Sequence, residues 1–204
     1  MSYYEFVKNY LGTEPCENNH KYCDIGNTFC ILSEEGEGCY WFYETNHFIV
    51  EIHDFFIKKD VVNSTFPNIK PFISFSSSYI ITGNGESFNP YQTLSANSLY
   101  VVDAENIHRD YKFLLHRNFP YLSVGINFKK EMLEEYLYFL KKEKNISYSD
   151  IFTSIKPAIV KSFAPLAKAV SYTHLITLLG NCRFSHPKAS SETVSVVKNC
   201  VLGS

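Results

Sequence analysis

Apolar and polar residues alternate with a period of two over much of the chain between residues 28 and 128. Successive side chains of a strand point to opposite faces, so this alternation predicts β-strands. The predicted strands, in chain order, are Thr28–Ser33, Cys39–Tyr43, Phe48–Ile57, a strand around residues 73–81, Leu99–Val102, Tyr111–His116 and Leu122–Phe128. Short strands at this spacing, separated by turn residues, predict an antiparallel β-sandwich or β-barrel.

The strand around residues 73–81 and the turn after it carry the clearest local signals. Ser74, Ser76 and Ser78 alternate with large apolar residues, which predicts a face turned to solvent. The dipeptide Asn84-Gly85 is typical of two-residue hairpin turns, because both central positions of a type I′ turn need a positive φ. We therefore expect a hairpin at this dipeptide.

The period changes after Phe128 to that of a helix. Lys130–Lys144 is predicted to form an amphipathic helix. Its apolar stripe consists of Leu133, Tyr136, Leu137 and Leu140. A second helix is predicted from Pro157 to Phe163, because proline fits the first helical turn, and a short leading helix is predicted around residues 3–11. The predicted fold class is mainly β with C-terminal helices (α+β).

The helix at residues 130–144 has apolar residues on more than one side. Tyr138 and Phe139 lie off the stripe, and a helix with a second apolar side usually covers a second surface. We therefore expect the stripe to mediate dimerisation. The alternative is that the stripe packs on the β-barrel.

Composition and charge exclude several classes of protein. The 204 residues are 45% hydrophobic, 20% charged and 16% aromatic, which is typical of a globular chain. The net charge is −2, and there is no basic stripe of the kind with which nucleic-acid-binding proteins contact phosphates. No apolar run reaches the roughly 18 residues of a membrane span, and no signal-peptide pattern opens the chain. We expect a cytoplasmic protein with no membrane partner.

The cysteine spacing favours free thiols. Cys16, Cys23, Cys30 and Cys39 stand roughly seven to nine residues apart, whereas zinc ligands usually come in pairs two to four residues apart. A disulfide framework needs an oxidising compartment, which the lack of a signal peptide disfavours. We expect buried or half-buried thiols and no bound metal.

Catalytic motifs are scarce in this chain. It contains no G-x-S-x-G, H-E-x-x-H or G-x-x-x-x-G-K-[ST] motif, so we expect no enzyme and no cofactor. Glu51 and His53 share a strand face, but a metal-binding cupin needs a second histidine, and a lone strand histidine is more often a hydrogen-bonded wall residue. The acidic run Glu34–Glu37 is predicted to be a solvated turn.

Aromatic residues concentrate where a ligand pocket is expected to form. The predicted strand Cys39–Tyr43 is rich in rings, and the following strand adds a histidine and further rings. A barrel interior lined by large rings and a few polar groups is the usual construction of a small-molecule pocket. The expected ligand-binding residues are Trp41, Tyr43, His53 and Phe55, with at least two of them facing one cavity. The alternative is that the rings simply fill the barrel.

Six short segments occur in an order that resembles a known family. They are Gly38–Glu44 (GCYWFYE), Ile52–Phe56 (IHDFF), Asn89–Ser95 (NPYQTLS), Leu115–Pro120 (LHRNFP), Ser123–Ile126 (SVGI) and Glu134–Leu137 (EEYL). Together they resemble the amino-terminal regulatory region of AraC-type bacterial transcription regulators, in particular a branch common in low-GC Firmicutes, over roughly residues 20–168. The resemblance implies a cupin-like β-barrel that senses a small-molecule effector, helices that form a homodimer, and contact with DNA only through a carboxy-terminal helix-turn-helix domain.

The segment after Lys168 departs from that family. Residues 169–204 are too few for two helix-turn-helix units, and Val170–Leu175 resembles the translation of a transposase end sequence used in sequencing libraries. We expect a sensor barrel at residues 1–128, a helical dimerisation segment at 129–168 and a non-native or disordered tail at 169–204. We also expect no binding of operator DNA by this chain. The alternative is an unusual native tail.

Three functions are compatible with these features. The expected one is the ligand-sensing and dimerisation portion of an AraC-type regulator that lacks its own DNA-binding domain. The alternatives are a small cupin-type enzyme acting on a sugar or aromatic compound, and an interaction module with a solid barrel. A stoichiometric metal would favour the enzyme, and an accessible cavity would separate the sensor from the solid module.

Overall fold

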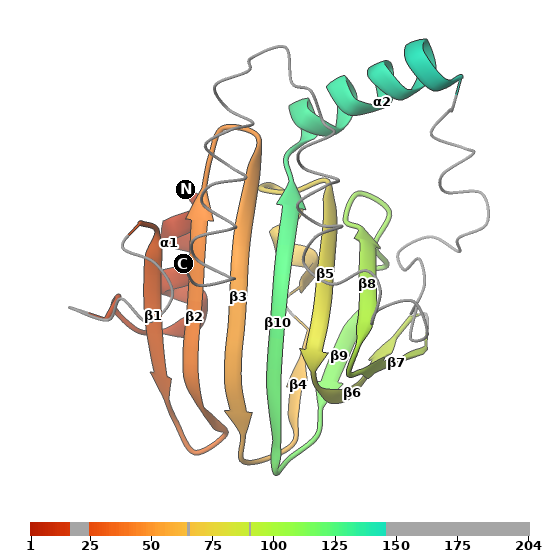
Figure 1. Ribbon diagram of the computed structural model, residues 1–204. Coiled ribbons are helices and arrows are strands. Elements are labelled where there is room, and N and C mark those ends of the chain that lie inside the picture. Colours follow the sequence, from red (N-terminus) through yellow and green to blue (C-terminus); the bar gives the residue numbers. More distant parts are fainter. Residues whose placement is uncertain (17–24, 65, 90, 146–204) are drawn as a thin grey trace.

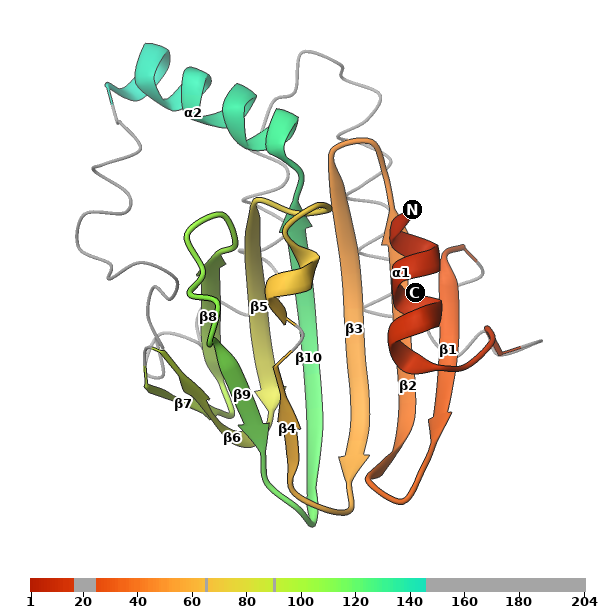
Figure 2. The same cartoon turned by 180° about the vertical axis from the view of Figure 1, so that it is seen from behind.

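Two antiparallel β-sheets form the body of the protein. The computed structural model describes residues 1–16, 25–64, 66–89 and 91–145. Within these residues a six-stranded sheet packs against a four-stranded sheet (Figure 1). Figure 2 shows that the four-stranded sheet and helix α1 (Tyr3–Leu11) lie on the same side of the six-stranded sheet. The chain therefore has the predicted mainly antiparallel, sandwich-like architecture.

Each sheet has a fixed strand order. The six-stranded sheet runs β1 (Asn27–Leu32), β2 (Gly36–Glu44), β3 (Phe48–Ile57), β10 (Phe119–Phe128), β5 (Phe75–Thr82) and β8 (Ser98–Asp103). The four-stranded sheet runs β4 (Val61–Asn63), β9 (Lys112–Leu115), β6 (Asn84–Phe88) and β7 (Gln92–Ser95), and a 3-10 turn η1 (Phe66–Ile69) follows β4.

Strand β3 lies at the centre of the large sheet. It pairs with β2 on one side and with β10 over its full length on the other. All five residues from Phe48 to Ile52 are buried, so both faces of this part of β3 are covered. Burial on both faces explains why apolar residues occupy both alternating sets of positions in this strand.

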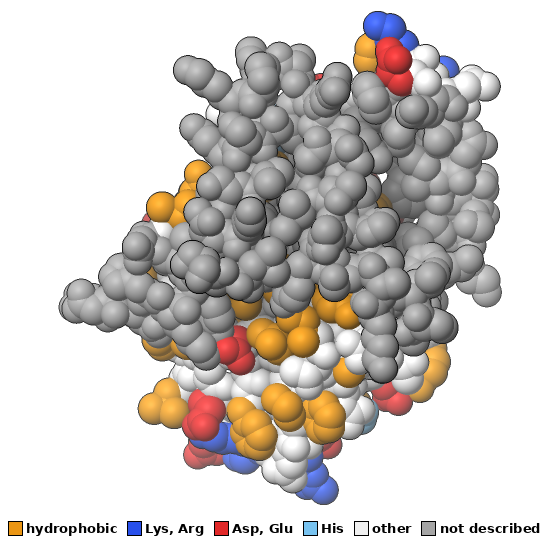
Figure 3. All heavy atoms as spheres, in the orientation of Figure 1, with side chains coloured by type: hydrophobic (Ala, Val, Ile, Leu, Met, Phe, Trp, Pro, Cys, Tyr) orange, Lys and Arg blue, Asp and Glu red, His pale blue; other side chains and the backbone are white. Residues whose placement is uncertain are grey.

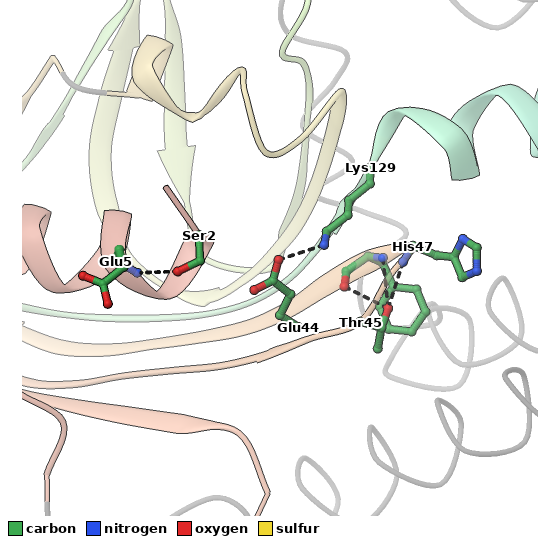
Figure 4. A network of polar contacts seen from close by, with 7 residues as sticks. Ser2, Glu5, Glu44, Thr45, His47 and Lys129 are labelled. Atoms are coloured by element: carbon green, nitrogen blue, oxygen red, sulfur yellow. Dashed lines mark hydrogen bonds and ion pairs between the residues drawn. The ribbon is translucent and has the colours of Figure 1, made fainter.

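Local hydrogen bonds set the ends of the elements (Figure 4). The Ser2 hydroxyl accepts a hydrogen bond from the Glu5 backbone N–H and caps α1, at 3.2 Å. The Thr45 hydroxyl oxygen accepts hydrogen bonds from the backbone N–H groups of His47 and Phe48 in the turn between β2 and β3. The β2–β3 hairpin is therefore closed by side-chain contacts as well as by its ladder.

Helix α2 (Lys130–Lys144) begins just beyond the end of β10, with the bounds that the sequence predicts. Lys129, the residue before it, donates a hydrogen bond from Nζ to Oε1 of Glu44 at 2.8 Å, which ties the start of the helix to the end of β2 (Figure 4). The helix extends beyond the edge of the sheets (Figures 1 and 2). No helix in the described part of the chain is long and apolar enough to cross a bilayer.

Several expectations fall outside what the structure describes. The predicted helix from Pro157 to Phe163 and the tail at residues 169–204 lie beyond residue 145. The side chains of the predicted dimerisation stripe, Leu133, Tyr136, Leu137 and Leu140, are also outside the described set. Dimerisation through α2 stays a prediction.

The expectation that Ser74, Ser76 and Ser78 face solvent is wrong. Ser74 and Ser76 are each 4% exposed, and Ser76 and Ser78 line an internal cavity. The alternation correctly predicts that β5 is a strand, but the serines lie on the face of β5 that is turned toward the four-stranded sheet. A period of two defines two faces without stating which of them is buried.

The hairpin expected at Asn84-Gly85 is also wrong. Both residues belong to β6, and the chain passes between Thr82 and Asn84 from the six-stranded to the four-stranded sheet. Gly85 serves close packing instead of a turn, because a Cβ there would lie 2.3 Å from the backbone oxygen of Leu114 in β9.

Two of the cysteines expected to be free are joined. Cys16 and Cys30 form a disulfide with a Cα–Cα distance of 5.7 Å. An isolated bridge between Pro15 and Phe29 aligns the segment after α1 with β1 and brings the two cysteines together. Cys39 is partly buried, as expected.

Candidate ligand-binding cavity

A cavity of about 280 Å³ lies between the two sheets and beside helix α1. Its wall draws on all six strands of the large sheet, on β4, β7 and β9 of the small sheet, and on one face of α1. The exposed members of its lining are Tyr10, Ser33, Glu35 and Glu37, so the cavity opens between α1 and the turn from β1 to β2. This volume is close to the lower end of the roughly 300–1,000 Å³ that is typical of small-molecule pockets.

Aromatic side chains from both sheets and from α1 contribute to the wall. The rings of Phe55 and Tyr121 lie 5.9 and 6.3 Å from the imidazole of His53, measured between ring centroids. On the opposite side, the hydroxyls of Tyr100 and Tyr111 are hydrogen-bonded at 2.5 Å. Burial raises the pKa of Tyr100 to about 12, and it raises the pKa of Tyr111 still further, so both phenols stay neutral and act as hydrogen-bonding groups.

Glu51 is the acidic group inside the cavity, and it is only 6% exposed. Its Oε2 accepts hydrogen bonds from the hydroxyl of Tyr40 at 2.8 Å and from that of Tyr3 at 3.4 Å, and the two hydroxyls are 2.8 Å apart. Burial and the nearby carboxylate of Glu51 raise the pKa values of both tyrosines well above the usual range. This cluster links β2, β3 and α1 through a hydrogen-bond network.

His53 is placed two residues after Glu51 on the same face of β3. Its Nδ1 lies 3.3 Å from the hydroxyl of Ser123, across the β3–β10 pair in which these two residues are direct partners. Burial lowers the pKa of His53, and the charge of Glu51 offsets part of this effect. At neutral pH the imidazole is therefore uncharged, and it offers both a donor and an acceptor.

Small residues leave room for these polar groups. Gly125 of β10 faces Glu51 of β3, and a Cβ at Gly125 would lie 2.9 Å from Oε1 of Glu51 and 3.0 Å from Oγ of Ser78. No hydrogen bond joins Glu51 Oε1 or Ser78 Oγ to any residue in the described ranges. The cavity thus has polar atoms that can take a partner from a bound molecule.

The structure separates the four residues that the sequence analysis expected at the ligand site. His53 and Phe55 line the cavity, but Trp41 and Tyr43 lie on the opposite face of the large sheet. Trp41 is fully buried there and donates a hydrogen bond from Nε1 to the backbone oxygen of Ile25 at 3.0 Å. The ring of β2 that faces the cavity is that of Tyr40, one residue before Trp41. The expectation for β2 was therefore wrong by one position, which exchanges the two faces of the strand.

Several lining residues were missed from the sequence. Tyr40, Tyr121 and Ser123 were not singled out, Ser78 was expected to face solvent, and Glu51 was not among the four expected ligand-binding residues. A signal was present, because Glu51 and His53 are two polar residues two positions apart on a strand whose other residues are largely apolar. Two such residues on one face of a buried strand indicate a polar patch inside the protein.

The described side chains do not assemble a three-ligand metal group. Within residues 1–16, 25–64, 66–89 and 91–145, no set of three His, Cys, Asp or Glu residues is close enough to hold a metal ion. Glu51 and His53 supply one carboxylate and one imidazole to the cavity, and no third such residue among the described ones lies close enough to complete a metal site with them. The chemistry that the described cavity offers is hydrogen bonding, apolar contact and one buried carboxylate.

Comparison with known proteins shows a likeness to AraC-like regulators. No protein-family model matches the sequence, and no curated protein matches it. The AraC-like transcriptional activator CuxR is 10% identical with a TM-score of 0.45, and the match covers 87% of this chain and 62% of CuxR. ToxT from Vibrio cholerae is 8% identical with a TM-score of 0.43, over 76% of this chain and 54% of ToxT. A ToxT structure with a bound unsaturated fatty acid is 13% identical with a TM-score of 0.40, over 78% and 57% of the two chains. This chain spans less than two thirds of the length of these proteins.

Proposed function

We propose that this chain is the ligand-sensing part of an AraC-type transcription regulator and acts in the cytoplasm. The observation that carries the proposal is the cavity between the sheets, which combines an aromatic wall with a few polar groups. This combination is typical of sites that bind a small molecule. The six ordered segments that resemble AraC-type regulators support the same assignment.

The position of the cavity suggests how binding is communicated. Tyr121 and Ser123 contribute to the lining from β10, and β10 ends at Phe128, directly before α2. A ligand that binds one arrangement of β10 and α2 better than another shifts the population toward it. Ligand binding in the cavity therefore changes the position of α2.

The remaining parts of the assignment follow from this arrangement. We propose that residues 1–128 sense the effector and that residues 129–168 join two copies through Leu133, Tyr136, Leu137 and Leu140. DNA contact belongs to a carboxy-terminal helix-turn-helix domain of the whole regulator. The cupin-like character of the barrel and the Firmicutes-like branch are part of the same proposal.

The cavity also bears on the alternatives. An interaction module with a solid barrel would have side chains filling its interior, whereas this protein has an internal cavity with polar atoms in its lining. For the enzyme, Ser123 and His53 are the best candidates in the described residues, at 3.3 Å. An activated serine needs a base that a third group orients, and no described carboxylate is hydrogen-bonded to His53. We therefore favour binding over catalysis.

A titration with neutral ring compounds tests the proposal. The full chain, labelled at its methyl groups, is titrated with 2-phenylethanol, indole and 1-naphthol and followed by NMR. We expect saturable shifts at Leu94 and Leu115, which line the cavity, and none at Leu32, which is 84% exposed. If none of the three compounds gives saturable shifts at the cavity methyls, the ligand-sensing function is overturned.

A further inference from the structure

The charged residues that line the cavity are all acidic. Glu51 lies inside, Glu35 and Glu37 lie at the mouth, and no lysine or arginine occurs among the described residues of the lining. Glu37 is paired with Lys58 at 2.6 Å, whereas no cation in the described chain is paired with Glu35 or Glu51. A molecule that enters therefore meets negative charge at the mouth and again inside.

Only one of the two carboxylate oxygens of Glu51 accepts hydrogen bonds from the described chain. Its Oε2 accepts the two tyrosine hydroxyls, while Oε1 lies over Gly125 beside the hydroxyl of Ser78 and receives no donor from the described chain. A carboxylate offers about four lone-pair sites, so the acceptor capacity of Oε1 remains open. A buried carboxylate is costly unless a partner satisfies it, and the cavity is the direction from which such a partner can come.

The walls suit the same kind of partner. Phe55, Tyr121 and Tyr100 present rings to the cavity, and the negative face of a ring attracts a cation as well as an apolar body. His53 carries no charge at neutral pH and so does not repel a cation. Nothing in the described lining offers the positive charge that a buried carboxylate ligand needs.

We propose that the cavity binds a small compound with an apolar ring-sized body and a protonated amine, that Glu51 is the counter-charge for the amine, and that carboxylate ligands are excluded. The inference rests on the proposed ligand-sensing function and adds the chemical class of the effector. In the bound state one ammonium N–H donates to Glu51 Oε1, and the Ser78 hydroxyl beside it accepts a second N–H. The ring lies against Phe55 and Tyr121.

Three probes with one ring and different charges test this directly. The full chain is titrated by calorimetry at pH 7 with 2-phenylethylamine, 2-phenylethanol and phenylacetate. We expect the amine to bind at least tenfold more tightly than the alcohol, and phenylacetate to bind more weakly than either. Because a pair inside the cavity is screened much less than a surface pair, the preference should persist in 0.5 M salt.

A matched pair of variants locates the preference. Glu51→Gln keeps the shape and an acceptor for the tyrosine hydroxyls but removes the charge, and we expect it to weaken amine binding at least tenfold while the alcohol is unaffected. Glu134→Gln removes the same charge at an exposed position of α2 and should leave all three affinities unchanged. The ranking of the three probes by the wild-type chain needs no variant, so it decides the question even if Glu51→Gln does not fold.

The outcomes separate this inference from the function on which it rests. Phenylacetate binding as tightly as the amine, or an amine affinity that Glu51→Gln leaves unchanged, overturns the amine assignment and leaves a ligand-sensing cavity. Failure of all three probes to bind overturns the sensing function itself.

Discussion

The two faces of the six-stranded sheet differ in how many polar residues they bury. An antiparallel sheet commonly turns apolar residues to the interior and polar residues to water. Here the face toward the small sheet carries apolar side chains such as Phe55 and Ile80, and among them it also buries a set of polar and small residues, namely Glu51, His53, Ser76, Ser78, Ser123 and Gly125. The opposite face carries Trp41, Val50, Ile52, Val124 and Ile126, each at most 3% exposed.

The two faces also differ in how completely side chains fill the space beside them. Large side chains fill the outer face, whereas serines and a glycine leave unfilled space on the inner face, and that space is the cavity. Toward the hairpin ends the outer face reaches the surface, where Leu32 and Phe56 are exposed and apolar side chains gather in Figure 3. We therefore expect substitutions on the outer face to change stability and those on the inner face to change binding.

The largest expected effect is that of Trp41→Ala on the outer face. Trp41 is fully buried and its Nε1 is hydrogen-bonded to Ile25, so the substitution leaves a void and an unpaired carbonyl. We expect the free energy of unfolding to fall by about 3–5 kcal/mol, measured by urea denaturation. The affinity of the remaining folded protein for 2-phenylethanol should stay within about twofold, because the side chain does not reach the cavity.

Leu32→Ala is the control for this prediction. Leu32 is on the neighbouring strand and is 84% exposed, so its truncation should cost less than about 0.5 kcal/mol. If Trp41→Ala abolishes binding of the probe while the chain keeps its stability, the assignment of the two faces is reversed.

Much of this sheet could be predicted from the sequence, and the errors have a common physical cause. The strands β2, β3 and β10 and the helix α2 follow from period and composition, because these signals are local. The direction of a face is not local. Ser76 and Ser78 were assigned to solvent and Trp41 to the cavity because alternation is symmetric between the two sides, and only the position of the small sheet breaks that symmetry.

The path of the chain between the sheets was hidden for a similar reason. Asn84-Gly85 has the composition of a tight turn, yet β6 pairs with β7 and β9 in the four-stranded sheet, whereas β5 belongs to the six-stranded sheet. The glycine is required by the close approach of Leu114 in another strand, which is a contact between distant parts of the sequence. A contact between residues so far apart in the sequence cannot be predicted from the residues next to the glycine.

An intermediate effect is expected from pH, through His53 on the inner face. Burial lowers the pKa of His53 in the folded protein. As the pH falls below about 6.5, the unfolded chain takes up a proton on this histidine before the folded protein does, so stability is lost. The loss should reach at most about 1.4 kcal/mol per pH unit and should end below the folded-state pKa.

The comparison of wild type with His53→Gln isolates this contribution. The other histidines are the same in both proteins, so the difference in the pH dependence of urea denaturation between pH 7 and pH 5 belongs to position 53. We expect the wild type to lose more stability than the variant over this range. Equal losses would mean that His53 takes up a proton in the folded state, and the inner face would then tolerate a charge that we expect it to exclude.

The smallest expected effect compares adjacent serines of β5 that face opposite sides. Ser78 lines the cavity and Ser77 does not, and neither hydroxyl is hydrogen-bonded to a residue of the described chain. Ser78→Ala and Ser77→Ala should each change the free energy of unfolding by less than about 0.5 kcal/mol, because no intramolecular hydrogen bond is lost. Ser78→Ala should nevertheless weaken 2-phenylethanol binding roughly two- to tenfold, which is the range of one neutral hydrogen bond, and Ser77→Ala should leave it unchanged. Calorimetry on both variants measures the difference, and equal affinities would show that the ligand hydroxyl does not reach β5. The two substitutions remove the same hydroxyl from the same strand and are expected to have the same effect on stability. Any difference in binding between the two variants therefore comes from the face of β5 on which each serine lies.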